Sequence, residues 1–347
     1  MIARADVWHL SQGNVVEDLL DWKNRYLEMV QGKTTSARTM AIYSGIIDDL
    51  VEYSRQFQDE VAISDIGAFY IVRFLEDKAK TAVKGFSDQT RNLYIRVIKT
   101  FFKFIEENNI ESFSMLYNIR NLKVKRIDPA DNKKPAYTGD QVDKIITTME
   151  KIRLKTEKSP KRAITMNRNF IMTKLALYAG LRACEIAKVK YEDLESHTDG
   201  DSGQELYRIE IMGKGETKQY TYIVKERIEE ELCAMRRIGN AKGLIAISST
   251  GKPLGPVQIN HNISRITRQA GMSKQGVHIF RHTYARQLLR EGIDTEIVRQ
   301  LLRHKKIATT VDFYLATDED AKAAAAARVG HRHNRNKIQN EQSGDIH

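Results

Sequence analysis

Residues 278–314 read HIFRHTYARQLLREGIDTEIVRQLLRHKKIATTVDFY, and their pattern decides the fold class of the C-terminal half of the chain. Phe280 and Tyr284 are one helical turn apart, so both can anchor the same helix face in a core. A second helix is predicted over 294–302 and a short third helix over 309–315. Three helices in close succession indicate a mainly α-helical domain.

The residues before this stretch predict a small β element among further helices. Two apolar runs alternate with polar residues, as half-buried strands do, and they flank Gly213-Lys214-Gly215-Glu216, which predicts a β-hairpin. The basic segment 155–168 is expected to be a loop. The fold class is therefore predicted to be mainly α with a small β-hairpin or sheet (α+β). The remaining helices are predicted from Thr138, over 169–179 with Gly180 as C-cap, and over 226–237, 257–270 and 278–290.

The N-terminal part carries four amphipathic segments that predict a small helical bundle. Ser87 is expected to cap the fourth helix, because its hydroxyl can accept a hydrogen bond from an unpaired backbone N–H. The apolar positions at helical spacing are Val16, Leu19, Leu20, Leu27 and Val30, then Met40, Tyr43, Ile46, Ile47 and Leu50, then Ile66, Phe69, Tyr70, Phe74 and Leu75, and last Leu93, Tyr94, Val97, Ile98, Phe101, Phe102 and Ile105.

A basic segment separates the two parts. Residues 119–135, IRNLKVKRIDPADNKKP, are polar and carry two prolines, which is typical of a linker. This linker either lies along DNA or is simply solvated, and the sequence favours neither. The predicted boundaries are 1–118 for an N-terminal helical domain, 119–136 for the basic linker, 137–330 for a C-terminal domain and 331–347 for a disordered tail.

The charge balance favours an anionic partner. The formal net charge is +11. Residues 1–70 hold 6 Lys and Arg against 11 Asp and Glu, and residues 71–130 hold 12 against 7. These two segments cancel, so the positive surplus lies beyond residue 130. Nucleic acid is the first candidate partner, and the alternative is a basic surface that serves only solubility.

Other features exclude several classes of protein. The only two cysteines, Cys184 and Cys233, indicate a reducing compartment rather than a disulfide scaffold, and no paired Cys and His spacing indicates zinc. The sequence contains no apolar run of about 18 residues that would span a membrane, and its N-terminus lacks a signal-peptide core. We therefore expect a cytoplasmic protein that has no metal and no membrane partner.

Two motifs in the C-terminal part each contain an arginine that is a candidate site residue. Residues 179–186, AGLRACEI, place Arg182 directly after a helix-breaking glycine, from where it can point into a cleft. His278 and Arg281 are three residues apart and share one helix face. Each motif alone has an ordinary explanation, a surface arginine or a structural His–Arg pair.

His304 and Tyr314 follow further along the chain. His304 lies where the helix over 294–302 ends. Thr309 and Asp312 resemble a capping box that starts the short helix carrying Tyr314. A tyrosine on a short helix is most often a packing residue. Tyr314 is a candidate site residue only because of its place in the order of motifs.

In that order, these residues resemble the catalytic domain of the tyrosine recombinases, the family that includes phage integrases and the Xer chromosome-dimer resolvases. The resemblance runs from about Tyr137 to Tyr314, and the helical N-terminal part is similar in layout to the family's core-binding (SAM-like) domain. It implies a helical core-binding domain and a mixed catalytic domain that form a C-shaped clamp around duplex DNA. The residues that carry it are Arg182, Lys214, His278, Arg281, His304 and Tyr314.

The resemblance implies a role for each of these residues. Arg182 and Arg281 would clamp the scissile phosphate, and Tyr314 would be the nucleophile. His278 would accept the proton of the tyrosine, and Lys214 would protonate the leaving 5′ oxygen. The product would be a 3′-phosphotyrosyl link, which conserves the bond energy, so no cofactor, ATP or metal is required.

His304 would hydrogen-bond the phosphate, but the residues around it depart from the family pattern. Many relatives have glycine before this histidine, where this chain has Arg303, and small polar residues where it has Lys305 and Lys306. These side chains either add charge close to the phosphate or only solvate the turn. Cys184, in the first motif, is expected to be a buried structural thiol.

The implied function is site-specific recombination of double-stranded DNA at a palindromic site by a homotetramer, alone or with an accessory protein. The two-domain layout lacks the arm-binding domain of many phage integrases, which favours a Xer-type resolvase acting on the nucleoid. An integrase of a mobile element is the runner-up. Less favoured are a type IB topoisomerase-like relaxing enzyme and a DNA-binding protein without catalysis, and the six-residue set argues against the latter.

Residues 318–328 are Ala-rich and begin with three acidic residues, which predicts a helix. In the family, a C-terminal helix packs into the neighbouring subunit, and small side chains suit such a groove. The alternative is a helix that docks on its own subunit or frays.

Deleting the residues from 317 onward is therefore expected to abolish cooperative synapsis on DNA, because the subunits lose the exchanged helix. Gel shifts over a range of protein concentrations measure this cooperativity. Cooperativity that survives the deletion would rule out the exchange.

Overall fold

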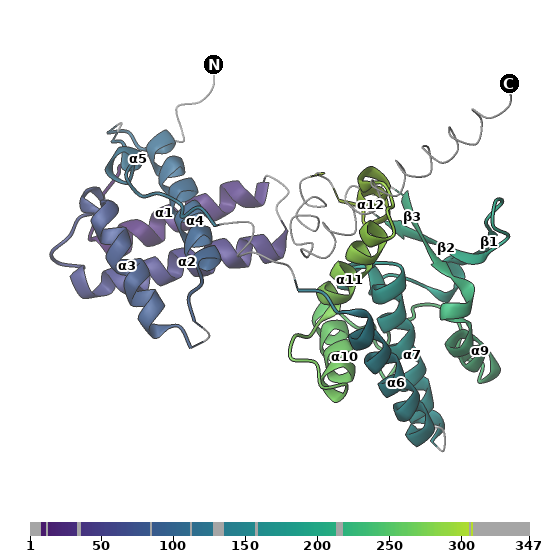
Figure 1. Ribbon diagram of the computed structural model, residues 1–347. Coiled ribbons are helices and arrows are strands. Elements are labelled where there is room, and N and C mark those ends of the chain that lie inside the picture. The colour runs from purple at the N-terminus through teal and green to yellow at the C-terminus, as the bar shows by residue number, and fades with distance from the viewer. Residues whose placement is uncertain are drawn as a thin grey trace, which may run out of the picture. The chain divides into compact units, whose positions relative to one another are not determined.

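The computed structural model describes residues 8–11, 13–32, 36–83, 85–111, 113–127, 135–156, 159–212, 218–304 and 307. The chain divides into two compact units, residues 1–128 and 129–347, each with its own hydrophobic core (Figure 1). The finer domain boundaries and the clamp arrangement stay predictions. The helices predicted over 309–315 and 318–328, the hairpin tip with Lys214 and the tail 331–347 lie outside the described residues.

The first unit is the helical bundle that its amphipathic segments predict. Ser87 caps the fourth helix as predicted, since its Oγ accepts a hydrogen bond from the Thr90 backbone N–H at 3.2 Å. Trp22 and Phe101 are among the aromatic side chains buried in its core. The helices are α1 (Val15–Gly32), α2 (Ala37–Ser54), α3 (Ala68–Thr81), α4 (Asp88–Asn108) and α5 (Met115–Asn118), with 3-10 turns at Arg55–Phe57 and Ile63–Asp65.

Phe69 does not lie on the apolar face that its spacing predicted. α3 turns Ile71 and Phe74 toward the core, and Phe69 lies on the other side of the helix, where it is 70% exposed. The Arg73 guanidinium lies 4.9 Å from the centre of the Phe69 ring. An aromatic side chain at helical spacing therefore does not by itself locate the core.

The first residues of the predicted linker are held by the first unit. Ile119 and Leu122 are buried in its core. The Asn92 side chain donates a hydrogen bond to the Lys125 carbonyl at 2.8 Å and accepts one from the Lys125 N–H at 2.9 Å. The chain is thus tied to the bundle at least as far as Lys125.

The second unit combines helices with a three-stranded antiparallel sheet of order β1-β2-β3 (Figure 1). The predicted hairpin is confirmed as β2 (Glu205–Met212) and β3 (Lys218–Val224). The sequence did not predict β1 (Leu194–Thr198), because its side chains are nearly all exposed and show no alternating apolar pattern. The helices are α6 (Gly139–Thr156), α7 (Pro160–Tyr178), α8 (Ala183–Ile186), α9 (Glu229–Arg237), α10 (Pro256–Gln269), α11 (Val277–Arg290) and α12 (Thr295–Leu301), with 3-10 turns at Tyr191–Asp193 and Lys225–Arg227.

The prediction of a loop over 155–168 is wrong, because most of this segment belongs to α7. Pro160 starts the helix, which suits a residue that has no N–H to donate. The basic character of the segment is misleading, since Arg168 is buried and donates a hydrogen bond to the Asn240 side chain at 2.7 Å. A basic side chain that has a hydrogen-bond partner can therefore be buried within a helix.

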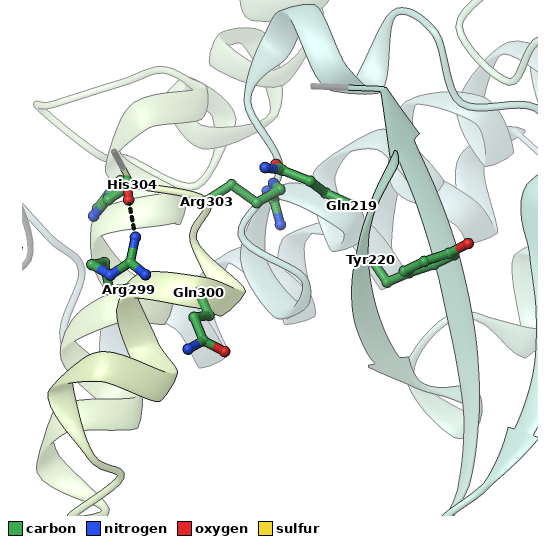
Figure 2. Close-up of a pocket in the computed structure, with 6 residues that line it drawn as sticks. All are labelled: Gln219, Tyr220, Arg299, Gln300, Arg303 and His304. Atoms are coloured by element: carbon green, nitrogen blue, oxygen red, sulfur yellow. Dashed lines mark hydrogen bonds between the residues drawn. The ribbon is translucent and has the colours of Figure 1, made fainter. Parts of the chain in front are cut away.

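The chain after α12 turns sharply beside β3 (Figure 2). Asp294 caps α12 by accepting a hydrogen bond from the Glu296 N–H at 2.7 Å. Beyond the helix, Arg299 Nη1 donates to the His304 carbonyl at 2.7 Å, the contact drawn as a dashed line in Figure 2. This contact fixes the backbone at one of the predicted site residues.

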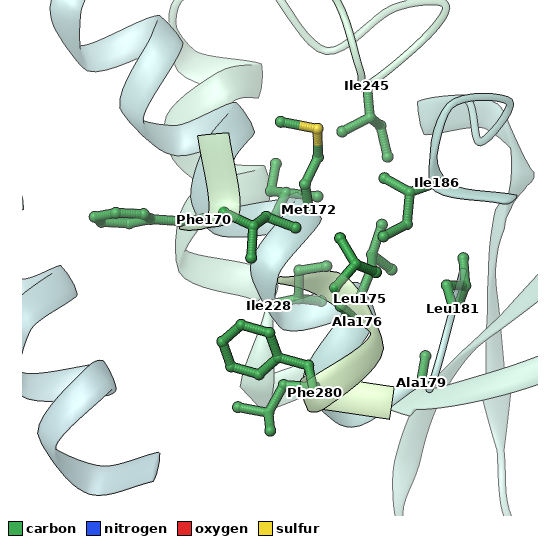
Figure 3. Packing of buried hydrophobic residues seen from close by; sticks show 14 of the residues in the cluster. Phe170, Met172, Leu175, Ala176, Ala179, Leu181, Ile186, Ile228, Ile245 and Phe280 are labelled. Atoms are coloured by element: carbon green, nitrogen blue, oxygen red, sulfur yellow. The ribbon is translucent and has the colours of Figure 1, made fainter. Parts of the chain in front are cut away.

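α7 is the central helix of the second unit, in contact with α6, α8, α9, α10, α11 and β3. Its buried side chains, such as Phe170 and Leu175, pack in one cluster with Phe280 of α11 (Figure 3). Ala179 and Leu181, which flank Gly180, are buried in the same cluster. The loop from α7 to α8 is therefore anchored in the core.

Gly180→Ala is expected to lower the free energy of unfolding by about 2–5 kcal/mol. Gly180 has a φ of +61°, and an added Cβ would lie 2.6 Å from Tyr284 Cδ1. Denaturant unfolding measures the loss.

Gly203→Ala is the matched control, because Gly203 has a φ of +68° but no heavy atom within 4 Å of an added Cβ. Gly203→Ala should lower the free energy of unfolding only by the cost of the left-handed backbone conformation, about 1–2 kcal/mol. Equal losses in the two variants would contradict the tight packing at Gly180.

Candidate active site

Arg182 lies at the start of α8. Glu185 of the same helix accepts hydrogen bonds from both its backbone and its side chain. Glu185 Oε2 accepts a hydrogen bond from the Arg182 backbone N–H at 2.8 Å, and Oε1 accepts one from Arg182 Nη1 at 2.7 Å. The neighbouring Leu181 and Ile186 are buried, which fixes the backbone. The Arg182 side chain remains 31% exposed, so it can reach a ligand from solvent.

Arg281 of α11 is almost completely buried, with 4% of its side chain exposed. Its guanidinium donates hydrogen bonds to the carbonyls of Gly180 and Leu302. Its Nη1 also lies 3.9 Å from Glu185 Oε2. Arg281 therefore joins α11 to the loop before α8 and to the end of α12.

Arg303 follows α12 and reaches the same carboxylate. Its Nη2 donates to Glu185 Oε2 at 2.8 Å and its Nε donates to Oε1 at 3.3 Å. The Arg303 carbonyl accepts a hydrogen bond from Arg182 Nη2 at 3.3 Å. We refer to Arg182, Glu185, Arg281 and Arg303 as the arginine cluster.

The arginine cluster carries an excess of positive charge. Burial acts to raise the pKa of Glu185, but the hydrogen bonds and charge of Arg303 outweigh it and hold that pKa below its ordinary value. Burial, followed by the like charges of Arg182 and Arg303, lowers the pKa of Arg281 to about 9. In the cluster, three guanidinium groups surround one carboxylate. Such a cluster favours a bound anion.

A pocket of about 360 Å³ lies next to the cluster, between β3 and the end of α12 (Figure 2). His304 lines it and is 7% exposed. Arg303 lines it as well, so the pocket and the cluster share a wall. The other lining residues are Gln219, Tyr220, Arg299 and Gln300.

The structure brings some of the predicted site residues together. Arg182 and Arg281 meet around Glu185, and His304 follows the third arginine directly. His278 is exposed on α11, one turn before Arg281, with its ring centre 6.4 Å from that of His282. Their catalytic roles stay predictions. Lys214 and Tyr314 lie outside the described residues.

Two residues of the arginine cluster, Glu185 and Arg303, were not among the predicted catalytic residues. The interval from Arg182 to Glu185 is that of a capping box, which is the signal that could have found the carboxylate. Arg303 does not merely solvate the turn, since only 3% of its side chain is exposed. Cys184, expected to be buried, is exposed because the short α8 turns Ile186 to the core instead.

Metal ligands and membrane spans were both predicted to be absent from this chain. In the part of the chain that the structure describes, no three His, Cys, Asp or Glu side chains group in a way that could hold a metal ion. Among the same residues, no helix combines the length and apolar character that crossing a membrane requires. The expectation that no metal is required stays a prediction.

Comparison with known sequences identifies relatives. A model of the phage integrase family matches residues 136–320. The tyrosine recombinase XerC of Thermodesulfovibrio yellowstonii is 23% identical over 289 residues, which cover 80% of this chain and 85% of that protein. The tyrosine recombinase XerA of Pyrococcus furiosus is 27% identical over 304 residues, which cover 86% and 90%.

Solved structures share the fold. The XerH site-specific recombinase bound to palindromic difH substrate, in a post-cleavage complex, gives a TM-score of 0.72 at 19% identity and covers 92% of this chain and 99% of its own. A lambda integrase tetramer bound to a Holliday junction gives 0.61 at 18% identity and covers 85% and 76%. These similarities confirm the predicted fold class, mainly α with a small sheet.

Glu185→Gln is expected to destabilise the protein at neutral pH by about 3 kcal/mol, since it leaves buried guanidinium groups without their counter-charge. The folded-state pKa of Glu185 lies below its ordinary value of 4.5. The carboxylate therefore stabilises the fold above that value, and the stabilisation is lost as the pH falls through the folded-state pKa. The gap in unfolding free energy between wild type and variant should narrow as the pH falls below the ordinary value of 4.5 and close as it falls through the folded-state pKa.

Denaturant unfolding from pH 7 to pH 3 checks this expectation. Glu107→Gln is the control, because its pair with Lys103 is exposed to solvent, and it should change stability little at any pH. A gap for Glu185→Gln that is as wide at pH 3 as at pH 7 would contradict the role of the charge.

Proposed function

Because the chain belongs to the phage integrase family, we propose that it is a site-specific tyrosine recombinase that cleaves and rejoins duplex DNA through a 3′-phosphotyrosyl intermediate. The observation that carries the proposal is the arginine cluster, in which three guanidinium groups outnumber one carboxylate beside a pocket. Two closely spaced guanidinium groups suit a phosphodiester, because each can bind phosphate oxygens through forked hydrogen bonds.

The proposed reaction is a transesterification. The Tyr314 Oη attacks the scissile phosphorus, the bond from phosphorus to the 5′ oxygen breaks, and a 3′-phosphotyrosyl ester forms. His278 takes the proton of the tyrosine, and Lys214 gives a proton to the 5′ oxygen. The 5′ hydroxyl of a strand from the partner duplex then attacks the phosphotyrosyl ester. A new phosphodiester forms and Tyr314 is released. One ester is made for each one broken, so no high-energy cofactor enters the balance.

Arg182, Arg281 and His304 act on the phosphate. The transition state places extra negative charge on the non-bridging oxygens, and preorganised cations stabilise it. The exposed part of Arg182 supports a direct contact, since it can turn a donor to the phosphate while Glu185 keeps its backbone in place. In this proposal His304 hydrogen-bonds the same phosphate, a role that its position on the pocket wall supports.

A Xer-type role in resolving chromosome dimers is the biological function that the relatives favour. The XerC and XerA proteins align with 80% and 86% of this chain, which supports this role over integration of a mobile element. The XerH complex with palindromic DNA and the lambda integrase tetramer support a two-fold symmetric site and a tetramer on synapsed DNA. The protein would then act in the cytoplasm, on the nucleoid.

A nicked suicide substrate that carries the target site tests the proposal. Wild-type protein is expected to form a covalent adduct with the DNA, visible as a shifted band on a denaturing gel. Tyr314→Phe should form none, and Arg182→Ala should slow adduct formation by about 10²–10³-fold.

Tyr117→Phe is the matched control, because this tyrosine lies exposed on the first unit, far from the cluster in sequence, and its variant should react like wild type. The proposal fails if wild-type protein binds the site without forming an adduct, or if Tyr314→Phe still forms it.

A further inference from the structure

Arg303 holds a backbone conformation that its side chain disfavours. Its φ is 55°, and among the residues that the structure describes it is the only non-glycine with a positive φ. This conformation costs an L-residue free energy that glycine does not lose, so it persists where contacts of the residue offset it. The contacts of the Arg303 side chain therefore indicate its role.

The Arg303 guanidinium directs its donors into the protein. Two of its hydrogen bonds go to the Glu185 carboxylate, and others go to the carbonyls of Leu301 at 2.5 Å and Gly180 at 3.3 Å. Only 3% of the side chain is exposed. Arg303 also lines the pocket, and its ion pair with Glu185 gives it a route to the reaction through that carboxylate.

Glu185 competes with a phosphate for the same cations. Its carboxylate is 2.7 Å from Arg182 Nη1 and 3.9 Å from Arg281 Nη1. Without Arg303, the full charge of the carboxylate would act on these two guanidinium groups and hold their donors away from a ligand. Arg303 draws that charge to itself through a forked pair with both oxygens.

We infer that Arg303 is a positioning residue of the phosphate site, which pairs with Glu185 so that Arg182 and Arg281 keep an unneutralised charge for the scissile phosphate. The inference rests on the proposed function, because it takes the phosphate as the ligand of these two arginines. A purely structural role is the competing account, in which Arg303 only joins the end of α12 to the Gly180 loop.

A double-mutant cycle between Arg303 and Glu185 separates the two accounts. Arg303→Gly suits the positive φ, removes the guanidinium and is expected to slow adduct formation on the suicide substrate about 10- to 100-fold at saturating DNA. DNA affinity, measured by fluorescence anisotropy, should change less than about threefold, because other contacts to the DNA backbone dominate it. In the Glu185→Gln background, the same substitution should slow the reaction by less than about threefold, since no carboxylate remains to be neutralised.

Arg303→Asn repeats the cycle with a side chain that tolerates positive φ, in case the glycine variant does not fold. All rates are measured well below the melting temperature of each variant. The inference is overturned if Arg303→Gly and Arg303→Asn react like wild type, or if their loss is as large in the Glu185→Gln background as it is with Glu185 intact. Failure of the proposed function looks different, because wild-type protein itself would then form no adduct.

Discussion

The Glu185 carboxylate accepts hydrogen bonds from Arg182 and Arg303 and lies 3.9 Å from Arg281. Through these contacts the loop before α8, helix α11 and the end of α12 meet at one point, although they are far apart in the sequence. Like charges this close repel one another, and burial adds to the cost. Glu185 offsets this repulsion, so the positions of Arg182, Arg281 and Arg303 depend on it.

Glu185 neutralises only part of the positive charge of the three arginines, and the remaining charge determines what the site can bind. Three guanidinium groups face one carboxylate, so charge is left for a ligand before any ligand binds. A site of this kind needs little reorganisation when negative charge develops on a phosphate. Removing Glu185 alone is costly, but replacing a whole buried ionic network with apolar residues often leaves stability unchanged or improves it, so the proposed role of the cluster is to bind an anion.

Periodic features of the sequence were predicted well, and features that depend on tertiary contacts were not. The helical bundle, the β2–β3 hairpin and the Ser87 cap follow from local pattern, and all three are confirmed. The pairing of Glu185 with Arg303 joins residues that only the fold brings together, so no local pattern shows it. Strand β1 has no apolar face, so no alternating pattern in the sequence predicts it. Helix α7 begins in a basic segment, and the buried Arg168 of that segment finds its hydrogen-bond partner only after folding.

A structure of the Tyr314→Phe variant bound to an uncleaved duplex target site would test the central claim most directly, through the distances from the scissile phosphate to the arginine cluster. We expect Arg182 and Arg281 each to donate hydrogen bonds to non-bridging oxygens of that phosphate, while Arg303 remains hydrogen-bonded to Glu185. A scissile phosphate bound elsewhere, with Arg182 and Arg281 still engaged only by Glu185 and backbone carbonyls, would contradict it.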